Sequence, residues 1–324
     1  MDAPTLDAAA LGLLLDRAAM ETPGVSTYCS AADWGLGAQL SLHRGRQVVL
    51  SRDQEHVFVV SVGQEEGGPL TIRSLESDWG FGSPLLGRDP DVAAQLAVAT
   101  LGAIAAPWKI AVLTGLSPEQ ATALLRQCKG RFRAVRRDGI VSAVARIDGG
   151  AEGYLARRAP KWRINSRREE RRAAQAGYEF EVMPGDADSD QVLARAHAVE
   201  ARSWKTAAGA GMLASESFRE FYRQVLSRAA SSGRLRAVFA VHGGEDRAFV
   251  FGARLGTTYR GFQLGYEVGL ERYGLGNQVQ RVLIESLAAE GVEHYDLGMD
   301  MAYKRRWAES LLRLDNVLVA PDTR

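Results

Sequence analysis

The chain has 324 residues, of which 46% are hydrophobic and 24% charged, and its formal net charge is +1. This composition is typical of a globular protein with a packed core, and the length predicts one large or two medium domains. A charge so close to zero argues against stable binding to nucleic acid or an anionic membrane through the overall field.

The cysteines and histidines exclude two common kinds of site. Cys29 and Cys128 are too few for a disulfide framework, and the five histidines are scattered without the spacing of metal ligands.

The N-terminus has no basic signal region, and the most apolar window, residues 92–106, is too short to span a bilayer. We therefore expect a cytoplasmic protein with no membrane segment and no metal.

In the first half, hydrophobic periodicity predicts a helix, three strands, a glycine-rich loop and a helix, followed by a strand, a helix and two strands. Ser117 is the expected N-cap of the last helix. The expected ranges are 6–19, 47–51, 57–62, 70–75, 78–84, 91–105, 108–113, 118–128, 132–135 and 140–147.

The second half begins with a basic helix whose Pro160 suits the first helical position. A strand, two helices, three strands, a glycine loop, a helix, a strand, a short helix and a last strand follow. The expected ranges are 160–176, 178–183, 190–204, 217–230, 235–241, 248–255, 259–266, 269–276, 277–290, 293–297, 302–309 and 313–319.

The same elements follow one another in both halves: three strands, a glycine loop, a helix, a strand, a short helix and a strand. No sequence identity accompanies it, so the repeat is one of architecture. The turn residues Asp148-Gly149-Gly150 predict a boundary between domains at 1–150 and 151–324. Antiparallel strands followed by a strand–helix–strand crossover predict a mixed α/β fold, with a mostly antiparallel sheet flanked by helices in each half.

A possible ligand-binding loop lies in residues 266–280, where glycines join a strand to a helix. The N-terminus of a helix presents unpaired N–H groups and the positive end of its dipole, which suit a phosphate or pyrophosphate. Gly274 and Gly276 would let the backbone approach such a ligand closely. The alternative is a tight turn that binds nothing.

The order of these elements, with Tyr303-Lys304 on the short helix, resembles the core of the GNAT acyltransferases. Within that superfamily the chain looks like the BioF2-like (CelD-like) branch, related to the FemABX aminoacyltransferases, which has two GNAT-like domains. The segments that carry the closer resemblance are Ser77-Asp78-Trp79-Gly80 with Pro84-Leu85, Pro160-Lys161-Trp162-Arg163-Ile164-Asn165 with Arg167-Arg168, Glu200-Ala201-Arg202-Ser203-Trp204-Lys205, and Asp296-Leu297-Gly298-Met299 with Tyr303-Lys304-Arg305-Arg306-Trp307.

The resemblance implies a tandem GNAT-like fold with an acyl-CoA, such as acetyl-CoA, as co-substrate. In the family the loop amides hold the CoA pyrophosphate. The loop here has one residue fewer than the family pattern between its arginine and its glycine, and Glu271 stands where a basic residue is expected. The resemblance assigns donor binding to Arg272, Gly274, Gly276, Asn277 and Gln278.

The resemblance also implies that Tyr303 protonates the departing thiolate. Acyl transfer from a thioester to an amine needs one proton removed from the nucleophile and one delivered to sulfur. Glu267 and Asp296, at the ends of neighbouring strands, are candidate bases, with Asp300 as a third option. The alternatives are structural roles for these residues and loss of the amine proton to water.

The acceptor is expected to be a small-molecule or peptide amine, with Asp78, Trp79, Trp204, Lys304 and Arg305 as its contacts. Asp78 and Trp79 occupy the first half's version of the donor loop, and Asp33-Trp34-Gly35-Leu36-Gly37 is a similar segment. The alternative is that both copies are tight turns with buried tryptophans. Neither copy completes a dinucleotide-binding fingerprint.

Residues 157–172 contain eight basic and two acidic side chains. They form either a solvated helix or a contact with an acidic or phosphorylated ligand, including aminoacyl-tRNA.

Neither cysteine shows signs of an activated nucleophile, so direct transfer is favoured over a covalent acyl-enzyme. Three functions follow: N-acyl transfer from acyl-CoA to an amine, FemABX-like transfer from aminoacyl-tRNA, and a non-catalytic GNAT-fold binding module.

Overall fold

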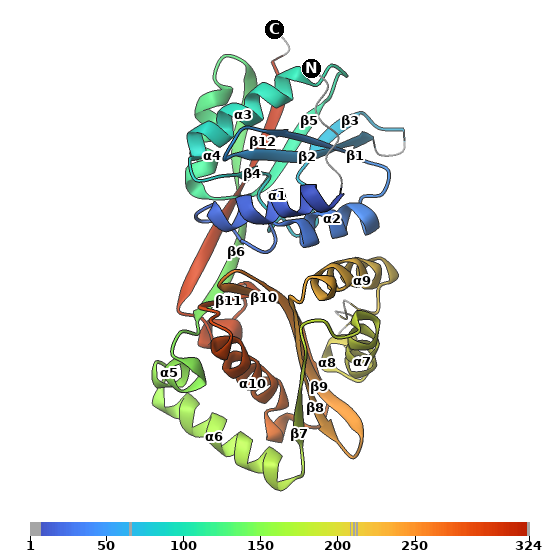
Figure 1. The fold of residues 1–324 in the computed structure, drawn as a ribbon, viewed down its shortest axis with the longest axis vertical. Helices are drawn as coiled ribbons and strands as arrows, with labels where there is room; N and C mark the ends of the chain where they lie inside the picture. Colours follow the sequence, from blue (N-terminus) through green and yellow to red (C-terminus); the bar gives the residue numbers. More distant parts are fainter. Residues whose placement is uncertain (1–7, 65–66, 208, 210, 212, 323–324) are drawn as a thin grey trace. The chain divides into compact units, whose positions relative to one another are not determined.

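The computed structural model describes residues 8–64, 67–207, 209, 211 and 213–322. Contacts divide the chain into unit 1, Met1–Ser142 with Leu312–Arg324, and unit 2, Ala143–Leu311. Each unit combines a mixed sheet with helices (Figure 1), which confirms the predicted α/β fold class. No helix in the described part of the chain is long and apolar enough to cross a membrane.

Unit 1 is built on strands in the order β1-β2-β3-β5-β12, with the short β4 beside β2. The first three strands are antiparallel, and β5 then runs parallel to β3. Ser117 caps α4 through its side chain, as expected. The elements are α1 (Ala8–Glu21), α2 (Ala32–Ser41), β1 (Gln47–Arg52), β2 (Val57–Gln64), β3 (Leu70–Arg73), β4 (Leu85–Leu86), α3 (Pro90–Ala103), β5 (Ile110–Leu116) and α4 (Pro118–Cys128).

The end of the chain groups with unit 1, whereas the sequence analysis placed all of residues 151–324 in the second domain. β12 (Ser310–Pro321) pairs antiparallel with β5, and Val317 and Val319 are fully buried in the core of unit 1. These strand pairs, which join residues far apart in sequence, assign the last strand to unit 1. Local turn residues carry no information about such pairing.

In the first half, one local expectation and one alternative reading differ from the structure. Residues 132–135 and 140–147 form one continuous strand, β6 (Phe132–Arg146), because the charged residues that interrupt the apolar pattern are exposed along it. The segment Asp33-Trp34-Gly35-Leu36-Gly37 lies inside α2 rather than in a tight turn. Its Trp34 is buried, and the Nε1 donates to Glu76 Oε2 at 3.1 Å.

Unit 2 repeats the arrangement, with strands in the order β7-β8-β9-β10-β11. β7 to β10 are antiparallel, and β11 runs parallel to β10 after the crossover helix α10. α10 covers one face of this sheet, and α7 and α9 cover the other (Figure 1). The elements are α5 (Gly150–Ala156), α6 (Pro160–Gln175), β7 (Glu179–Met183), α7 (Ser189–Ala201), α8 (Trp204–Ala207), α9 (Glu216–Ser231), β8 (Leu235–His242), β9 (Glu245–Leu255), β10 (Thr258–Tyr266), η1 (Glu271–Tyr273), α10 (Leu275–Ala289), β11 (His294–Met299) and η2 (Lys304–Arg306).

The parallel strands β10 and β11 pair over three positions only, from Thr258 with His294 to Arg260 with Asp296. Both strands continue beyond this point, so their C-terminal ends separate. Immediately after the last pair, a side chain at Gly261 would place its Cβ 2.8 Å from the Tyr295 ring. Glycine at 261 therefore allows β10 to pass close to β11 where the strands begin to diverge.

The packing of α10 on the sheet can be tested at Leu283, which is fully buried in the core of unit 2. Leu283→Ala is expected to lower the free energy of unfolding by about 3 kcal/mol, because it removes buried methyl groups and leaves a cavity. Glu285→Ala, on the exposed side of the same helix, should change it by less than about 0.5 kcal/mol. Denaturant unfolding of both variants is the measurement, and equal losses would contradict this packing.

Candidate functional site

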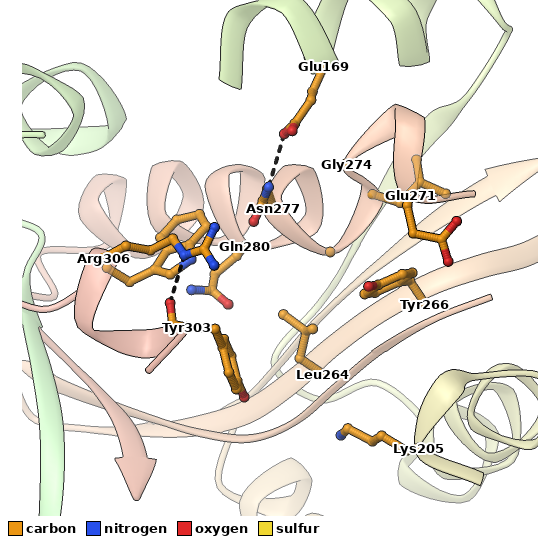
Figure 2. A pocket seen from close by; sticks show the side chains of 13 residues that line it. Glu169, Lys205, Leu264, Tyr266, Glu271, Gly274, Asn277, Gln280, Tyr303 and Arg306 are labelled. Carbon is orange, nitrogen blue, oxygen red and sulfur yellow. Dashed lines mark hydrogen bonds between the residues drawn. The ribbon is translucent and has the colours of Figure 1, made fainter. Parts of the chain in front are cut away.

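A pocket of about 320 Å³ lies within unit 2, where β10 and β11 separate. Its lining comes from α6, α8, β10, the start of α10 and the segment after β11 (Figure 2). Leu264 and Tyr266 of β10 and the buried Trp307 supply apolar surface. The rings of Trp307 and Trp162 pack edge to face with their centroids 4.9 Å apart, and this contact joins the pocket wall to α6.

The start of α10 forms one end of the pocket. Gly274 has a φ of 60°, a left-handed conformation that favours glycine, and it is the N-cap of the helix. Its carbonyl accepts from the backbone N–H groups of Asn277 at 2.8 Å and Gln278 at 3.0 Å. Gly274, Gly276 and Asn277 line the pocket, at the place where the sequence analysis expected a phosphate.

A carboxylate of the protein already occupies this end. Asn277 Nδ2 donates to Glu169 Oε2 of α6 at 3.0 Å, and a Cβ at Gly274 would lie 2.2 Å from the same oxygen. Glu271 also lines the pocket, and its Oε1 accepts from the Gly269 N–H at 3.1 Å. Two acidic side chains at the positive end of α10 do not fit the pyrophosphate of CoA.

Two of the residues expected to bind the donor lie outside the pocket lining. Arg272 is exposed, and its guanidinium lies over the ring of Tyr273, 4.6 Å from the centroid. Gln278 is fully buried, and its Nε2 donates to the backbone carbonyl of Ser166 at 3.2 Å. Gln278 therefore attaches α10 to α6 instead of facing a ligand.

Tyr303 reaches the pocket from the turn that precedes η2. Its side chain projects beside Leu264, on the opposite side of the pocket from Glu169 (Figure 2). The residue is 40% exposed, yet desolvation by its neighbours raises the pKa of the phenol. The short helix expected at residues 302–309 is the single 3₁₀ turn Lys304–Arg306, and Arg306 Nε donates to the Tyr303 carbonyl at 3.2 Å.

Glu267, a candidate base, is held by two arginines outside the pocket lining. Its Oε2 accepts from Arg247 Nη1 at 2.9 Å and from Arg202 Nε at 3.2 Å. Burial raises the pKa of the Glu267 carboxyl, but the hydrogen bonds from Arg247 and Arg202 outweigh this effect and the net shift is downward. A carboxylate with a lowered pKa is a weak proton acceptor.

Asp296, the second candidate base, is buried in an ion pair and lies outside the pocket lining. Its Oδ1 accepts from Arg260 Nη1 at 2.6 Å and from the Gly298 N–H at 2.9 Å. The side chains of Asp296 and Arg260 are each 5% exposed. Asp300, the third option, forms an ion pair with Arg305 at 2.7 Å. Each of the three carboxylates thus has a cationic partner.

Two lysines stand on the Tyr303 side of the site. Lys205 lines the pocket, its Nζ donates to Gln263 Oε1 at 2.9 Å, and burial lowers its pKa. Lys304 Nζ lies 5.8 Å from the centroid of the Tyr303 ring, and desolvation, with repulsion from Arg260, lowers its pKa to about 8. Lys205 was missed as a site residue, although it directly follows Trp204 in a segment that carries the family resemblance.

The other expected acceptor contacts are not gathered at this pocket. Asp78 and Trp79 belong to unit 1, where Asp78 Oδ2 lies 2.8 Å from His43 Nε2 and the Trp79 N–H donates to Glu76 Oε1 at 2.7 Å. Trp204 begins α8, and its side chain lies outside the described part of the structure. Of the five, Lys304 and Arg305 adjoin Tyr303, and Arg305 is exposed.

Burial raises the pKa of the Cys128 thiol to about 11, which keeps it from acting as a thiolate nucleophile. Cys29 is also buried. Among the residues that the structure describes, no group of three or more His, Cys, Asp or Glu side chains is arranged to hold a metal ion.

Comparison with known proteins identifies the domain that contains the pocket. Residues 160–305 match the family model described as an acetyltransferase (GNAT) domain, and they include α6, α10 and Tyr303. Unit 2 therefore carries a GNAT domain. The predicted relationship to this superfamily is confirmed, and the match supports an acyltransferase in general terms.

Solved structures with a similar fold extend along almost the whole chain. FemX is similar with a TM-score of 0.69 and 11% identity, covering 98% of this chain and 97% of its own. A conserved protein of unknown function from Bacteroides thetaiotaomicron VPI-5482 has a TM-score of 0.64 and 9% identity, covering 98% of both chains. A tandem GNAT protein from the clavulanic acid biosynthesis pathway has a TM-score of 0.50 and 13% identity, covering 96% of this chain and 94% of its own. At these identities the likeness is one of fold, and no curated protein sequence matches the chain.

The ion pair at Asp296 provides a test of its role. Asp296→Asn is expected to lower the free energy of unfolding by about 3 kcal/mol, because it removes the negative charge beside the buried Arg260 guanidinium. Glu267→Gln, whose partners are more exposed, should cost about 1 kcal/mol or less. Unfolding in denaturant and the rate of acyl transfer by the folded protein are measured for both variants. Unchanged stability of Asp296→Asn with a hundredfold lower rate would instead make Asp296 a catalytic base.

Proposed function

We propose that the GNAT domain of unit 2 transfers an acyl group from an activated donor to an amine, with Tyr303 protonating the leaving group. The observation that carries this proposal is the position of Tyr303 in the pocket between the separated strands. The acceptor would be a small-molecule or peptide amine. The BioF2-like branch stays a prediction from the sequence.

Tyr303 is suited to the role of proton donor. Desolvation raises the pKa of its phenol, so the hydroxyl is protonated at neutral pH. In direct transfer, the amine nitrogen forms a bond to the acyl carbon and the bond from that carbon to the leaving sulfur or oxygen breaks. The Tyr303 proton goes to the leaving atom, which lowers the cost of its negative charge.

The two lysines favour the attacking form of the amine. A positive charge near a bound amine disfavours its protonation, so Lys205 in the pocket lining, with Lys304 beside the Tyr303 ring, promotes a neutral nucleophile. Glu267 and Asp296 are engaged by arginines, and the amine proton can leave through water. The proposed reaction therefore needs no dedicated carboxylate base.

The donor is proposed as a thioester or an ester. GNAT domains generally bind acetyl-CoA or CoA, and acyl-CoA is the donor that the sequence resemblance implies. Glu169 and Glu271 do not fit its pyrophosphate at the start of α10, and the proposed reaction requires only the activated acyl group. What supports acyl transfer is the family match with the placement of Tyr303.

Replacement of Tyr303 tests the proposal. Tyr303→Phe keeps the ring and removes the hydroxyl, and kcat is expected to fall about a hundredfold with little change in KM. Tyr178→Phe, a buried tyrosine outside the pocket lining, should keep kcat within about twofold of the original protein. Steady-state kinetics with the active donor measures both. A pure binding module would show no transfer and would tolerate the loss of the Tyr303 hydroxyl.

The dependence of kcat on pH provides a second test of Tyr303→Phe. Because the pKa of Tyr303 is raised above its usual value of 10.0, the proton donor should persist to a pH above about 10 and be lost only as the pH rises further. The alkaline fall in kcat should be missing from the residual activity of Tyr303→Phe. An unchanged alkaline limb in this variant would assign the proton donor to another group.

A second candidate function is transfer from aminoacyl-tRNA, as in FemABX-like enzymes. The observation in its favour is the outer surface of α6, where basic side chains are exposed while Ser166 and Glu169 face α10. Such a surface suits the phosphates of a nucleic acid. Its exposed basic residues are Lys161, Arg167, Arg168, Arg171 and Arg172.

Salt dependence tests this candidate. If the α6 surface contacts phosphates, tRNA affinity should fall steeply with salt. Replacement of Arg167 and Arg168 by alanine should then reduce the slope of the logarithm of the binding constant against the logarithm of the salt concentration by about two. Arg126→Ala, an exposed arginine of α4, is the matched control and should leave the slope unchanged. Fluorescence anisotropy between 50 and 200 mM salt, the range over which phosphate contacts weaken strongly, is the measurement. Absence of tRNA binding at the low end would reject the candidate.

A further inference from the structure

Glu169 occupies the position at which an anionic ligand would meet α10. Its Oε2 accepts from Asn277 Nδ2 at 3.0 Å, and it lies so close to Gly274 that a Cβ there would be 2.2 Å from it. Figure 2 shows the carboxylate above the start of α10, opposite Lys205 and Tyr303. The negative charge compensates the positive end of the helix dipole, which is the interaction that a bound phosphate would otherwise make.

The contact does not depend on Glu169 alone, because α6 is attached to α10 on both sides of it. Gln278 Nε2 donates to the Ser166 carbonyl at 3.2 Å, and Arg281 Nη2 donates to Glu170 Oε1 at 2.7 Å. Trp162 of α6 also packs against Trp307. The helix that carries Glu169 is therefore held against α10, and this attachment keeps the Glu169 backbone beside the start of α10.

Glu271 adds a second negative charge at the same end. It lines the pocket from the 3₁₀ turn just before Gly274, so a phosphate at the start of α10 would meet two carboxylates. Each carboxylate would repel the negative charge of a phosphate bound there, and the repulsion is stronger at the half-buried Glu169 than at the exposed Glu271. The cations that line the pocket are Lys205 and Arg306. Arg306 donates to the Tyr303 carbonyl, and Lys304 lies beside the Tyr303 ring.

We propose that Glu169 determines the donor specificity of this site: it excludes a phosphate from the start of α10 and selects an activated acyl donor whose carrier places no phosphate there. The proposal rests on the acyl transfer proposed above and names the class of donor. The reacting carbonyl lies at the Tyr303 side, and the end of the pocket at Glu169 and Asn277 receives a neutral or cationic part of the ligand.

The test compares CoA with pantetheine, which has the same thiol arm without the nucleotide and its phosphates. Isothermal titration calorimetry measures the affinity of both for the full chain and for Glu169→Gln, which keeps the size of the side chain and an oxygen for Asn277. Glu170→Gln is the matched control, since Glu170 is the next residue on α6, pairs with Arg281 and lies outside the pocket lining. Thermal melting confirms that each variant is folded.

The original protein is expected to bind CoA no more than about threefold better than pantetheine. Glu169→Gln should bind CoA about tenfold more tightly, equivalent to about 1.4 kcal/mol, with pantetheine unchanged. Glu170→Gln should match the original protein. A gain in CoA affinity that weakens with salt would further attribute the effect to charge.

Two results would overturn the proposal. One is an original protein that binds CoA more than about tenfold better than pantetheine, which would mean that the pyrophosphate is accommodated despite Glu169. The other is a Glu169→Gln variant whose CoA affinity does not rise. Failure of the proposed function is distinguishable: it would appear as no acyl transfer from any thioester or aminoacyl ester, whatever the effect of Glu169→Gln on CoA binding.

Discussion

The site depends on the point at which β10 and β11 stop pairing. Arg260 and Asp296 form the last pair of the parallel register, and their side chains make a buried ion pair at 2.6 Å. Beyond it β10 no longer pairs with β11. Leu264 and Tyr266 of β10 stay paired with β9, and they line the pocket. A full-length parallel pairing would close this space. Asp296 Oδ1 also accepts from the Gly298 N–H, so one carboxylate satisfies both the buried guanidinium and a backbone donor of β11 beyond the last pair.

The separation of the strands also sorts the charges of the pocket. The crossover from β10 returns through α10, so the positive end of that helix lies at one side, and Glu169 and Glu271 collect there. The segment after β11 brings Tyr303 to the other side, where Lys205 also lies (Figure 2). Lys304 Nζ lies 5.8 Å from the centroid of the Tyr303 ring. A substrate bound across this pocket would meet carboxylates at one end and a proton donor with lysines at the other. This polarity is the physical basis for distinguishing donors by the charge of their carrier.

What the sequence predicted well was local. Strand periodicity, the glycines at 274 and 276 and the Tyr303-Lys304 pair all act through neighbouring residues, and their places follow from the order of elements. Glu169 was invisible as a site residue because its partner Asn277 is 108 positions away. The assignment of β12 to unit 1 was missed for the same reason, since its pairing with β5 joins the end of the chain to residues 111–116. Side-chain contacts between α6 and α10 cannot be read from the pattern of either helix alone.

The candidate bases show that the partners of a carboxylate affect its chemistry as much as its position in the fold. Carboxylates at the ends of diverging strands are expected to face the opening, yet Glu267 and Asp296 are satisfied by Arg247 and Arg260. A carboxylate held this way contributes to the structure as long as it stays ionised, and accepting a proton would break its ion pair. In the proposed mechanism Tyr303 protonates the leaving group, and the proton of the attacking amine goes to water. The arginine partners therefore determine whether these two carboxylates are available to accept a proton.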